Sequence, residues 1–378
     1  MPAVKTMAAW EQLATRIVFF VAGFAISSWA PLVPLVQAKI GLDDGQLGAL
    51  LLCLGLGSVI TMPFAGGLAA RFGCRTMILV AGGLVCLSLP VMAAAQTALQ
   101  LAVALLVFGA GLGTMDVVVN IQAVIVEKAA GRAMMSGFHG MYSVGGIIGA
   151  GVVTGLLSLR LPPLHAILAI IALSALLLGI ARKGLLPYGS EEDTPAFALP
   201  KGGVLLIGLL CFILFLAEGS VLDWSGVLLN TVRGVEKSSA GLGYVAFSIT
   251  MTLGRLTGDV IVQRLGPQRI LGLGGLCAAA GFALAALVPA WPVAVLGFAL
   301  VGVGASNAVP VLFSAAGRQT AMPGNLAIAA VTTLGYAGIL AGPALIGFAS
   351  RALTLPLALL GVAILLVGVS LSARRVTE

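Results

Sequence analysis

The run RIVFFVAGFAISSWAPLVPLV, residues Arg16–Val36, has one charged residue, at its first position. A helix of about 20 apolar residues is long enough to cross the hydrocarbon core of a bilayer. Similar runs recur along all 378 residues, of which 60% are hydrophobic and only 9% are charged. A soluble domain has about 25% charged residues, because its surface must face water. The sequence therefore predicts an all-α membrane protein with about twelve transmembrane helices.

The apolar runs and the loops between them also predict a topology. The expected spans are residues 14–36, 46–70, 76–95, 99–125, 137–158, 163–181, 203–229, 241–264, 270–289, 292–316, 324–349 and 354–373. Most of the 20 Lys and Arg residues fall in the ends and loops on one side. By the positive-inside rule, both termini are cytoplasmic, in what we expect to be the bacterial inner membrane. The net charge of +7 is thus a topology signal and does not indicate nucleic acid binding.

One strongly polar linker, RKGLLPYGSEEDTPAFALPKG, divides the chain. It predicts an N-terminal six-helix bundle over residues 1–181, a cytoplasmic linker over 182–202 and a C-terminal six-helix bundle over 203–378. The two halves look repeated, because one constant offset aligns three pairs of glycines: Gly73 with Gly266, Gly109 with Gly302, and Gly145 with Gly338. Two parallel repeats of this kind form a solute site at their interface near the middle of the membrane.

The loop GGLAARFGCR, Gly66–Arg75, resembles the signature that follows the second span of the major facilitator superfamily. Ala70 and Cys74 replace an acidic and a basic residue of that signature. Longer stretches resemble the YbjJ-type branch, which includes the rhizopine-associated protein MosC and lies near the fucose-type sugar permeases. They are SWAPLVP (Ser28–Pro34), MDVVVNIQAVIVEKAAGRAMMSGFHGMYSVGG (Met115–Gly146), AEGSVLDWSGVLL (Ala217–Leu229), FSITMTLGRLTGD (Phe247–Asp259) and LGYAGILAGPALIG (Leu334–Gly347). The resemblance covers nearly the whole chain and implies the two-bundle fold of that superfamily.

Ionisable residues inside spans are costly and usually functional, and the fourth span carries one at Asp116. Asn120 lies four residues later on the same helical face, and Glu127 continues that face. We expect Asp116 to accept protons in a water-lined cavity, Asn120 to bind substrate and Glu127 to serve gating or structure. The alternative is a structural hydrogen bond to a neighbouring span. Val309 is the counterpart of Asp116 in the second half, so a packing need shared by both halves does not explain the acid.

Three acids and an arginine lie in the seventh and eighth spans. Glu218, just past the middle of the seventh span, is predicted to carry protons in the central cavity. Asp223 points elsewhere because it is five residues on, and is assigned to substrate binding, an outer gate or a helix contact. Arg255 and Asp259 are spaced for an i, i+4 charge pair that is structural or gating. In the alternative, Arg255 pairs with Asp116 or Glu218 in one transport state only.

Four further residues complete the predicted site. His139 begins the fifth span. Because the unperturbed pKa of histidine lies nearest to neutrality, His139 is expected to relay protons close to Asn120 or Glu127. The alternative is that it forms a structural hydrogen bond. Tyr142 follows one turn later as a substrate ligand. Trp29 and Trp224, in the first and seventh spans, are expected to stack on a ring-shaped solute. They are equally compatible with an aromatic belt at the membrane surface.

These features predict a secondary active transporter that moves a small polar, sugar-like solute by alternating access with proton coupling. The alternatives are a proton-driven exporter of drugs or amphipathic metabolites and, in another class, a non-transporting sensor or scaffold. No GxxxxGK[ST], HExxH or GxSxG motif is present, so neither an ATP-driven pump nor an enzyme is expected. The five cysteines lack CxxC spacing, which predicts no metal and no cofactor. The expected partners are the solute, protons and the bilayer. The protein itself is expected to be a monomer.

Overall fold

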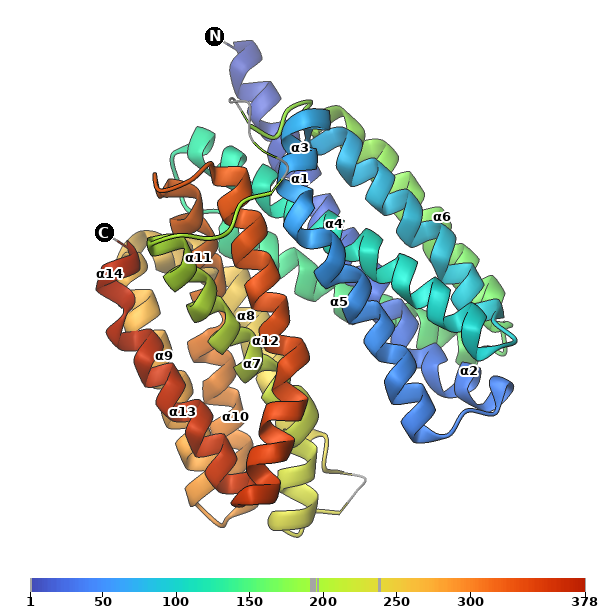
Figure 1. The fold of residues 1–378 in the computed structure, drawn as a ribbon, viewed down its shortest axis with the longest axis vertical. Helices are drawn as coiled ribbons and strands as arrows, with labels where there is room; N and C mark the ends of the chain where they lie inside the picture. The colour runs from blue at the N-terminus through green and yellow to red at the C-terminus, as the bar shows by residue number, and fades with distance from the viewer. Residues whose placement is uncertain (1, 191–194, 196, 237–238, 378) are drawn as a thin grey trace. The chain divides into compact units, whose positions relative to one another are not determined.

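A computed structural model describes residues 2–190, 195, 197–236 and 239–377, and these residues form helices, turns and loops without a β-strand (Figure 1). Within the described part, ten helices are long and apolar enough to cross a membrane. One of them, α3, contains two of the predicted spans, and α13 is a shorter apolar helix. The predicted all-α membrane fold with about twelve spans is confirmed.

The chain divides into two compact units, of which the first comprises residues up to Gly131, Met141–Leu199 and Pro323–Ala329. Its helices are α1 (Pro2–Trp29), α2 (Val33–Ile40), α3 (Asp44–Ala94), α4 (Ala98–Ala130), most of α5 (Met135–Ser158) and α6 (Pro163–Ala181). The long helix α3 packs along α4, and α6 packs against α1 and α3. Apolar side chains such as Phe19, Phe24 and Phe108 are fully buried between these helices.

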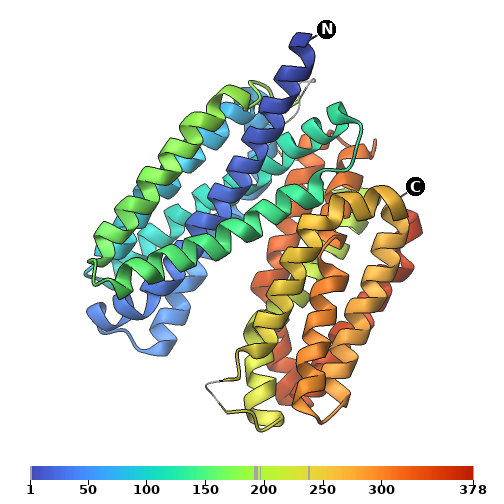
Figure 2. The same ribbon diagram turned by 180° about the vertical axis from the view of Figure 1, so that it is seen from behind.

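The second unit comprises Arg132–Gly140, Pro200–Met322 and the residues from Ala330 on. Its helices are α7 (Gly203–Val227), α8 (Leu242–Leu265), α9 (Pro267–Leu287), α10 (Trp291–Ala305), α11 (Ala308–Arg318), most of α12 (Gly324–Ala352), α13 (Leu355–Leu371) and α14 (Ala373–Thr377). Helix α9 packs against α10 and α13, and α10 packs against α8 (Figure 2). Helices α5 and α12 therefore each begin in one unit and continue in the other.

The glycine pairs that suggested a repeat adopt matching geometry. Gly73 has φ 80° and ψ 153°, and Gly266 has φ 80° and ψ 155°. A Cβ atom at Gly109 would collide with the backbone oxygen of Leu54, and one at Gly302 would collide with that of Phe247. Each half therefore has the same sharp turn and the same close helix crossing, which only glycine permits.

The predicted tenth span is two helices, because α10 ends at Ala305 and α11 begins at Ala308. Pro310 explains the break: it has no N–H to donate to the carbonyl of Ser306, four residues earlier, and its ring crowds that carbonyl. The predicted first span is also interrupted, since α1 ends at Trp29 and a short 3₁₀ turn precedes α2. Pro31 and Pro34 have the same effect there.

The start of the predicted linker packs onto the first unit. The N–H of Arg75 donates to the carbonyl of Leu186 at 2.7 Å, and the N–H of Leu186 donates to Gln122 Oε1 at 3.1 Å. Gln122 is fully buried and its Nε2 donates to Thr15 Oγ1 at 3.0 Å. These bonds fix the beginning of the linker beside the turn at Gly73. Linker residues 191–194 and 196 lie outside the described residues.

Gly73→Ala should destabilise the protein more than Gly266→Ala, its matched control in the repeat. Both variants place a side chain in a region of φ and ψ that is nearly restricted to glycine, at a cost of about 1–3 kcal/mol each. A Cβ at Gly73 would also collide with the backbone oxygen of Pro187, whereas Gly266 has open space there. Thermal unfolding of the two purified variants measures the difference. Equal losses of stability would contradict the contact with the linker.

Candidate functional site

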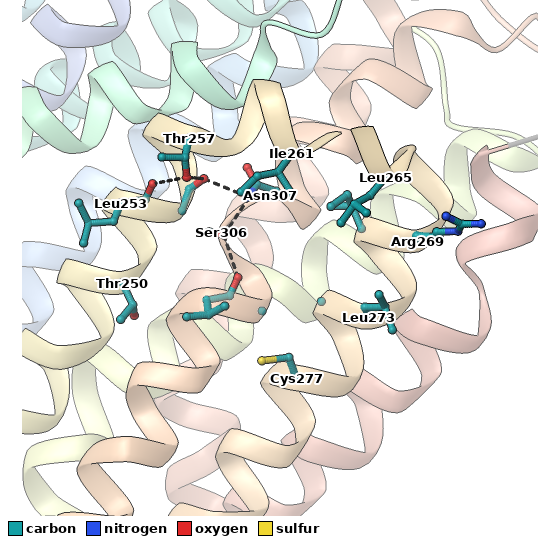
Figure 3. Close-up of a pocket in the computed structure, with 15 residues that line it drawn as sticks. Thr250, Leu253, Thr257, Ile261, Leu265, Arg269, Leu273, Cys277, Ser306 and Asn307 are labelled. Carbon is teal, nitrogen blue, oxygen red and sulfur yellow. Dashed lines mark hydrogen bonds between the residues drawn. The ribbon is translucent and has the colours of Figure 1, made fainter. Parts of the chain in front are cut away.

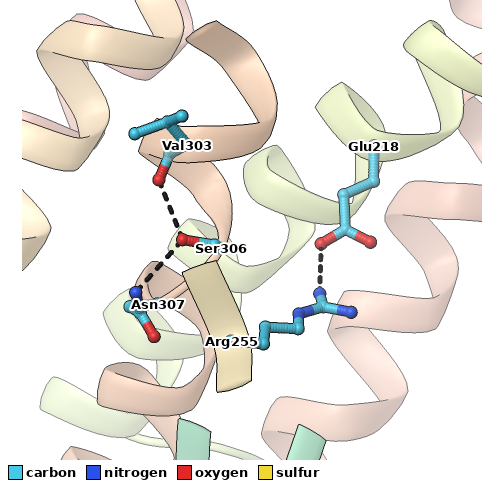
Figure 4. Close-up of polar contacts among 5 residues, drawn as sticks. All are labelled: Glu218, Arg255, Val303, Ser306 and Asn307. Carbon is cyan, nitrogen blue, oxygen red and sulfur yellow. Dashed lines mark hydrogen bonds and ion pairs between the residues drawn. The ribbon is translucent and has the colours of Figure 1, made fainter. Parts of the chain in front are cut away.

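The second unit holds a buried ion pair between two membrane-spanning helices. Arg255 Nη2 of α8 lies 2.8 Å from Glu218 Oε1 of α7 (Figure 4). The Arg255 and Glu218 side chains are 9% and 16% exposed. Either charge alone would be costly inside a bilayer, and each offsets the cost of the other. Glu218 was the alternative partner in the sequence interpretation of Arg255, so the two predicted functional groups are brought together.

Asp259, the expected i, i+4 partner of Arg255 on α8, contacts the first turn of α5 with its carboxylate. Its Oδ1 accepts a hydrogen bond of 3.0 Å from the backbone N–H of Gly137, in the first turn of that helix. The first N–H groups of a helix have no partner within it, and the positive end of the helix dipole favours an acid there. Gln263 of α8 donates to the carbonyl of Ala133 at 3.2 Å, just before α5. Asp259 therefore helps to hold the start of α5 against α8, and its pairing with Arg255 stays a prediction.

His139 lies in the segment of α5 that belongs to the second unit. It is buried, and its ring centroid is 5.6 Å from that of Phe313 on α11. A Cβ atom at the next residue, Gly140, would come within 3.4 Å of the backbone carbonyl carbon of Arg255 on α8. His139 therefore lies next to the point where α5 meets the backbone of Arg255, and its approach to Asn120 or Glu127 stays a prediction.

Asp116 and Asn120 lie together on α4 in the first unit. Asn120 is fully buried, and its Nδ2 donates to the backbone oxygen of Asp116 at 2.9 Å and to Asp116 Oδ1 at 3.4 Å. Asp116 is partly exposed, and so is Glu127, which lies about three turns further along the helix. The i, i+4 spacing predicted a shared helical face, and on that face the amide of Asn120 donates to the carboxylate of Asp116.

The predicted substrate ligands differ in exposure. Trp29 is 4% exposed, Trp224 and Tyr142 are partly exposed, and Asp223 is exposed. The Trp224 ring packs on Gly347 of α12. The indole Nε1 atoms of Trp29 and Trp224 are buried without a hydrogen-bond partner among the described residues. The indole N–H of each tryptophan could therefore donate a hydrogen bond to a solute, but the roles of Trp29 and Trp224 as substrate ligands stay predictions.

Two polar residues at the break between α10 and α11 were not predicted. Asn307 Nδ2 donates to the backbone oxygen of Gly254 at 3.1 Å and to Ser306 Oγ at 3.1 Å. Ser306 Oγ donates in turn to the carbonyl of Val303 at 2.8 Å (Figure 4). These bonds join the break to α8, which carries Arg255 one residue after Gly254. The signal was present in the sequence as Pro310, three residues after Asn307 inside an apolar span.

Comparison with known families agrees with this architecture. The sequence pattern of the Major Facilitator Superfamily matches residues 16–343. The chain belongs to the Major Facilitator Superfamily. It is accordingly a multi-pass membrane protein and a transporter of that superfamily.

Relatives within the superfamily match over most of their length. The chain is 56% identical over 369 residues to an uncharacterised MFS-type transporter of Yersinia pestis, covering 97% of this chain and 96% of the relative. It is 31% identical over 349 residues to the membrane protein MosC of Rhizobium meliloti, covering 90% and 84%. The predicted resemblance to the branch that contains MosC is confirmed.

Solved structures of the superfamily share the fold. The transporter FucP in the outward conformation matches with a TM-score of 0.79 and 18% identity, covering 98% of this chain and 99% of FucP. The proton:xylose symporter XylE matches with a TM-score of 0.77 and 14% identity, covering 99% and 96%. At such identities the likeness shows the Major Facilitator fold alone.

The stretch that resembles the superfamily signature also contacts the start of a helix in the same unit. Gly66 begins the stretch GGLAARFGCR within α3, and its carbonyl accepts a hydrogen bond of 2.9 Å from Asn325 Nδ2 at the start of α12. A Cβ at Gly66 would crowd the backbone of Asn325. The repeat offset aligns Gly66 with Asp259. The two related helix starts, of α12 and α5, are therefore held by an amide in one case and by a carboxylate in the other.

Proposed function

We propose that this Major Facilitator protein is a secondary active transporter of a small polar, sugar-like solute, coupled to protons. The observation that carries the proposal is the Glu218–Arg255 ion pair at 2.8 Å within membrane-spanning helices. Buried ionisable residues in transporters usually serve substrate or proton pathways. FucP, a fucose:proton symporter, and XylE, a proton:xylose symporter, share the fold and support the choice of solute and coupling ion.

The coupling step follows from the charge of the pair. A proton that binds Glu218 removes the negative charge opposite Arg255, so the guanidinium is released to a different partner. A charge that changes partner with protonation biases the two conformations of an alternating-access transporter. His139, close to Arg255, is the proposed relay. Asp116, in the other unit, is the proposed second proton acceptor, with Asn120 as its hydrogen-bond donor.

The remaining assignments complete the proposal. Trp29, Trp224, Tyr142 and Asp223 contribute to the solute site, and Asp259 holds the start of α5 in one transport state. The Lys and Arg bias favours cytoplasmic termini in a bacterial inner membrane. We expect a monomer to be sufficient for transport.

A thermal-shift screen of purified protein tests the solute class. A ligand that binds the folded state alone raises its apparent stability. We expect stabilisation by a sugar or polyol and none by cationic dyes. Stabilisation by dyes alone would replace the proposal with a drug exporter, which needs an apolar cavity.

Asp116→Asn should uncouple transport from the proton gradient. With the solute from the screen, proton-driven accumulation in proteoliposomes should fall about tenfold, a typical coupling between two ligands. Exchange of solute across the membrane without a gradient should persist, which separates lost coupling from misfolding. Asp116→Glu, which keeps the carboxyl group, should restore part of the accumulation. Full proton-driven accumulation in Asp116→Asn would contradict the role of this acid.

A further inference from the structure

A groove of about 640 Å³ runs along the second unit between α8, α9 and α10. Its lining is mostly apolar and includes Leu253, Ile261, Leu265, Leu273, Cys277 and Val303 (Figure 3). The side chains of Leu253, Leu273 and Val303 are 58%, 60% and 53% exposed, so the groove opens outward between the helices. A volume of this size is within the usual range of about 300–1,000 Å³ for small-molecule sites.

The shape of the groove fits a lipid chain. The lining residues on α8 extend from Thr250 to Leu265, which is about 22 Å of helix at about 1.5 Å per residue. Half of the hydrocarbon core is about 15 Å thick. The groove is therefore long enough for one acyl chain of one leaflet. Among the few polar side chains in it, Thr257 and Ser306 donate to backbone carbonyls close to them in the chain.

A cation lies at one end of this groove. Arg269 is a lining residue near Leu265 and Leu273 (Figure 3), and it is exposed. It forms no hydrogen bond or ion pair with any residue that the structure describes. It also lies in the first turn of α9, a 21-residue helix whose N-terminal N–H groups favour anions. A phosphate beside Arg269 would thus meet both a guanidinium and a helix N-terminus.

We propose that the groove binds an anionic diacyl phospholipid, with one acyl chain along α8 and the phosphate on Arg269. The charge at one end selects an anionic headgroup, because a basic residue at the membrane surface attracts acidic lipids. The apolar lining selects a lipid over a free phosphate compound. Neither Glu218 nor Arg255 lines the groove, and this proposal does not depend on the proposed function.

Arg269→Gln tests the headgroup contact, and Arg264→Gln is the matched control. Arg264 is an exposed arginine near the end of α8 that does not line the groove. Binding of phosphatidylglycerol and phosphatidylcholine to purified protein is measured by native mass spectrometry over a range of lipid concentrations. Arg269→Gln should weaken phosphatidylglycerol binding about fivefold, as expected for one basic residue at the surface. Phosphatidylcholine binding should be unchanged, and Arg264→Gln should resemble the wild type.

Val303→Phe tests the acyl-chain contact without altering a charge. The larger side chain fills part of the groove, while Leu296→Phe, seven residues earlier on the same face of α10, does not reach it. Val303→Phe should reduce phosphatidylglycerol binding, and Leu296→Phe should leave it unchanged. The two variants should unfold at the same temperature. Equal binding of both lipids by the wild type, no effect of Arg269→Gln, or full competition by glycerol phosphate would each overturn the proposal.

Discussion

Glu218→Gln should lower the free energy of unfolding by about 3 kcal/mol, as expected when one partner of a buried ion pair is removed. The variant leaves the Arg255 side chain, which is 9% exposed, without the carboxylate that lies 2.8 Å from its guanidinium. The glutamine side chain has nearly the same size, so loss of packing does not explain the effect. Unfolding of purified protein in a mild detergent, followed by circular dichroism, measures the change.

Asp223→Asn is the matched control for this prediction. Asp223 lies on the same helix, five residues after Glu218, but it is exposed. Its substitution should change stability by less than about 0.5 kcal/mol, as is usual for surface positions. The double variant Glu218→Gln/Arg255→Gln should recover part of the loss, because it removes both charges. Equal effects of Glu218→Gln and Asp223→Asn, or additive effects of the two substitutions in the pair, would contradict the ion pair.

Gly109→Ala should destabilise the first unit by about 3 kcal/mol, at the upper end of the usual cost of overpacking a core. A Cβ atom at this position would overlap the backbone oxygen of Leu54 on α3, which cannot move aside as a side chain can. Helices α3 and α4 would have to separate to admit it. In a membrane this loss is large, since close van der Waals packing is a main source of helix association.

Gly83→Ala provides the control for Gly109→Ala. Gly83 also lies on α3, and a Cβ there would have no neighbour within 4 Å. Alanine in place of glycine within a helix is then expected to stabilise by about 0.5–1 kcal/mol. Gly302→Ala, the repeat counterpart of Gly109→Ala, should be destabilising in the same way. Thermal unfolding of the three variants tests the prediction, and a neutral Gly109→Ala would show that the helices are not in close contact.

Several features of the fold followed from the sequence because their causes are local. The length and polarity of each run determine whether a segment can span a bilayer, so the number of spans was predictable. The glycines at a constant offset indicated the repeat, and Gly73 and Gly266 share their backbone conformation. Asp116 and Asn120 are in contact because four residues complete about one helical turn. The helix break at Ser306 could also be predicted from the sequence, because Pro310 follows it within an apolar span.

The partners of residues on different helices were decided by tertiary structure. Arg255 had a local candidate in Asp259, yet its described partner is Glu218, on another helix. His139 lies beside Phe313, and the linker begins with a buried contact to Gln122. Spacing along one helix fixes which residues share a face, but the neighbour of that face depends on how all the helices rotate and pack. The sequence by itself therefore determined the spans, the repeat and the acids within the membrane, and the packing of the helices determined which charges meet.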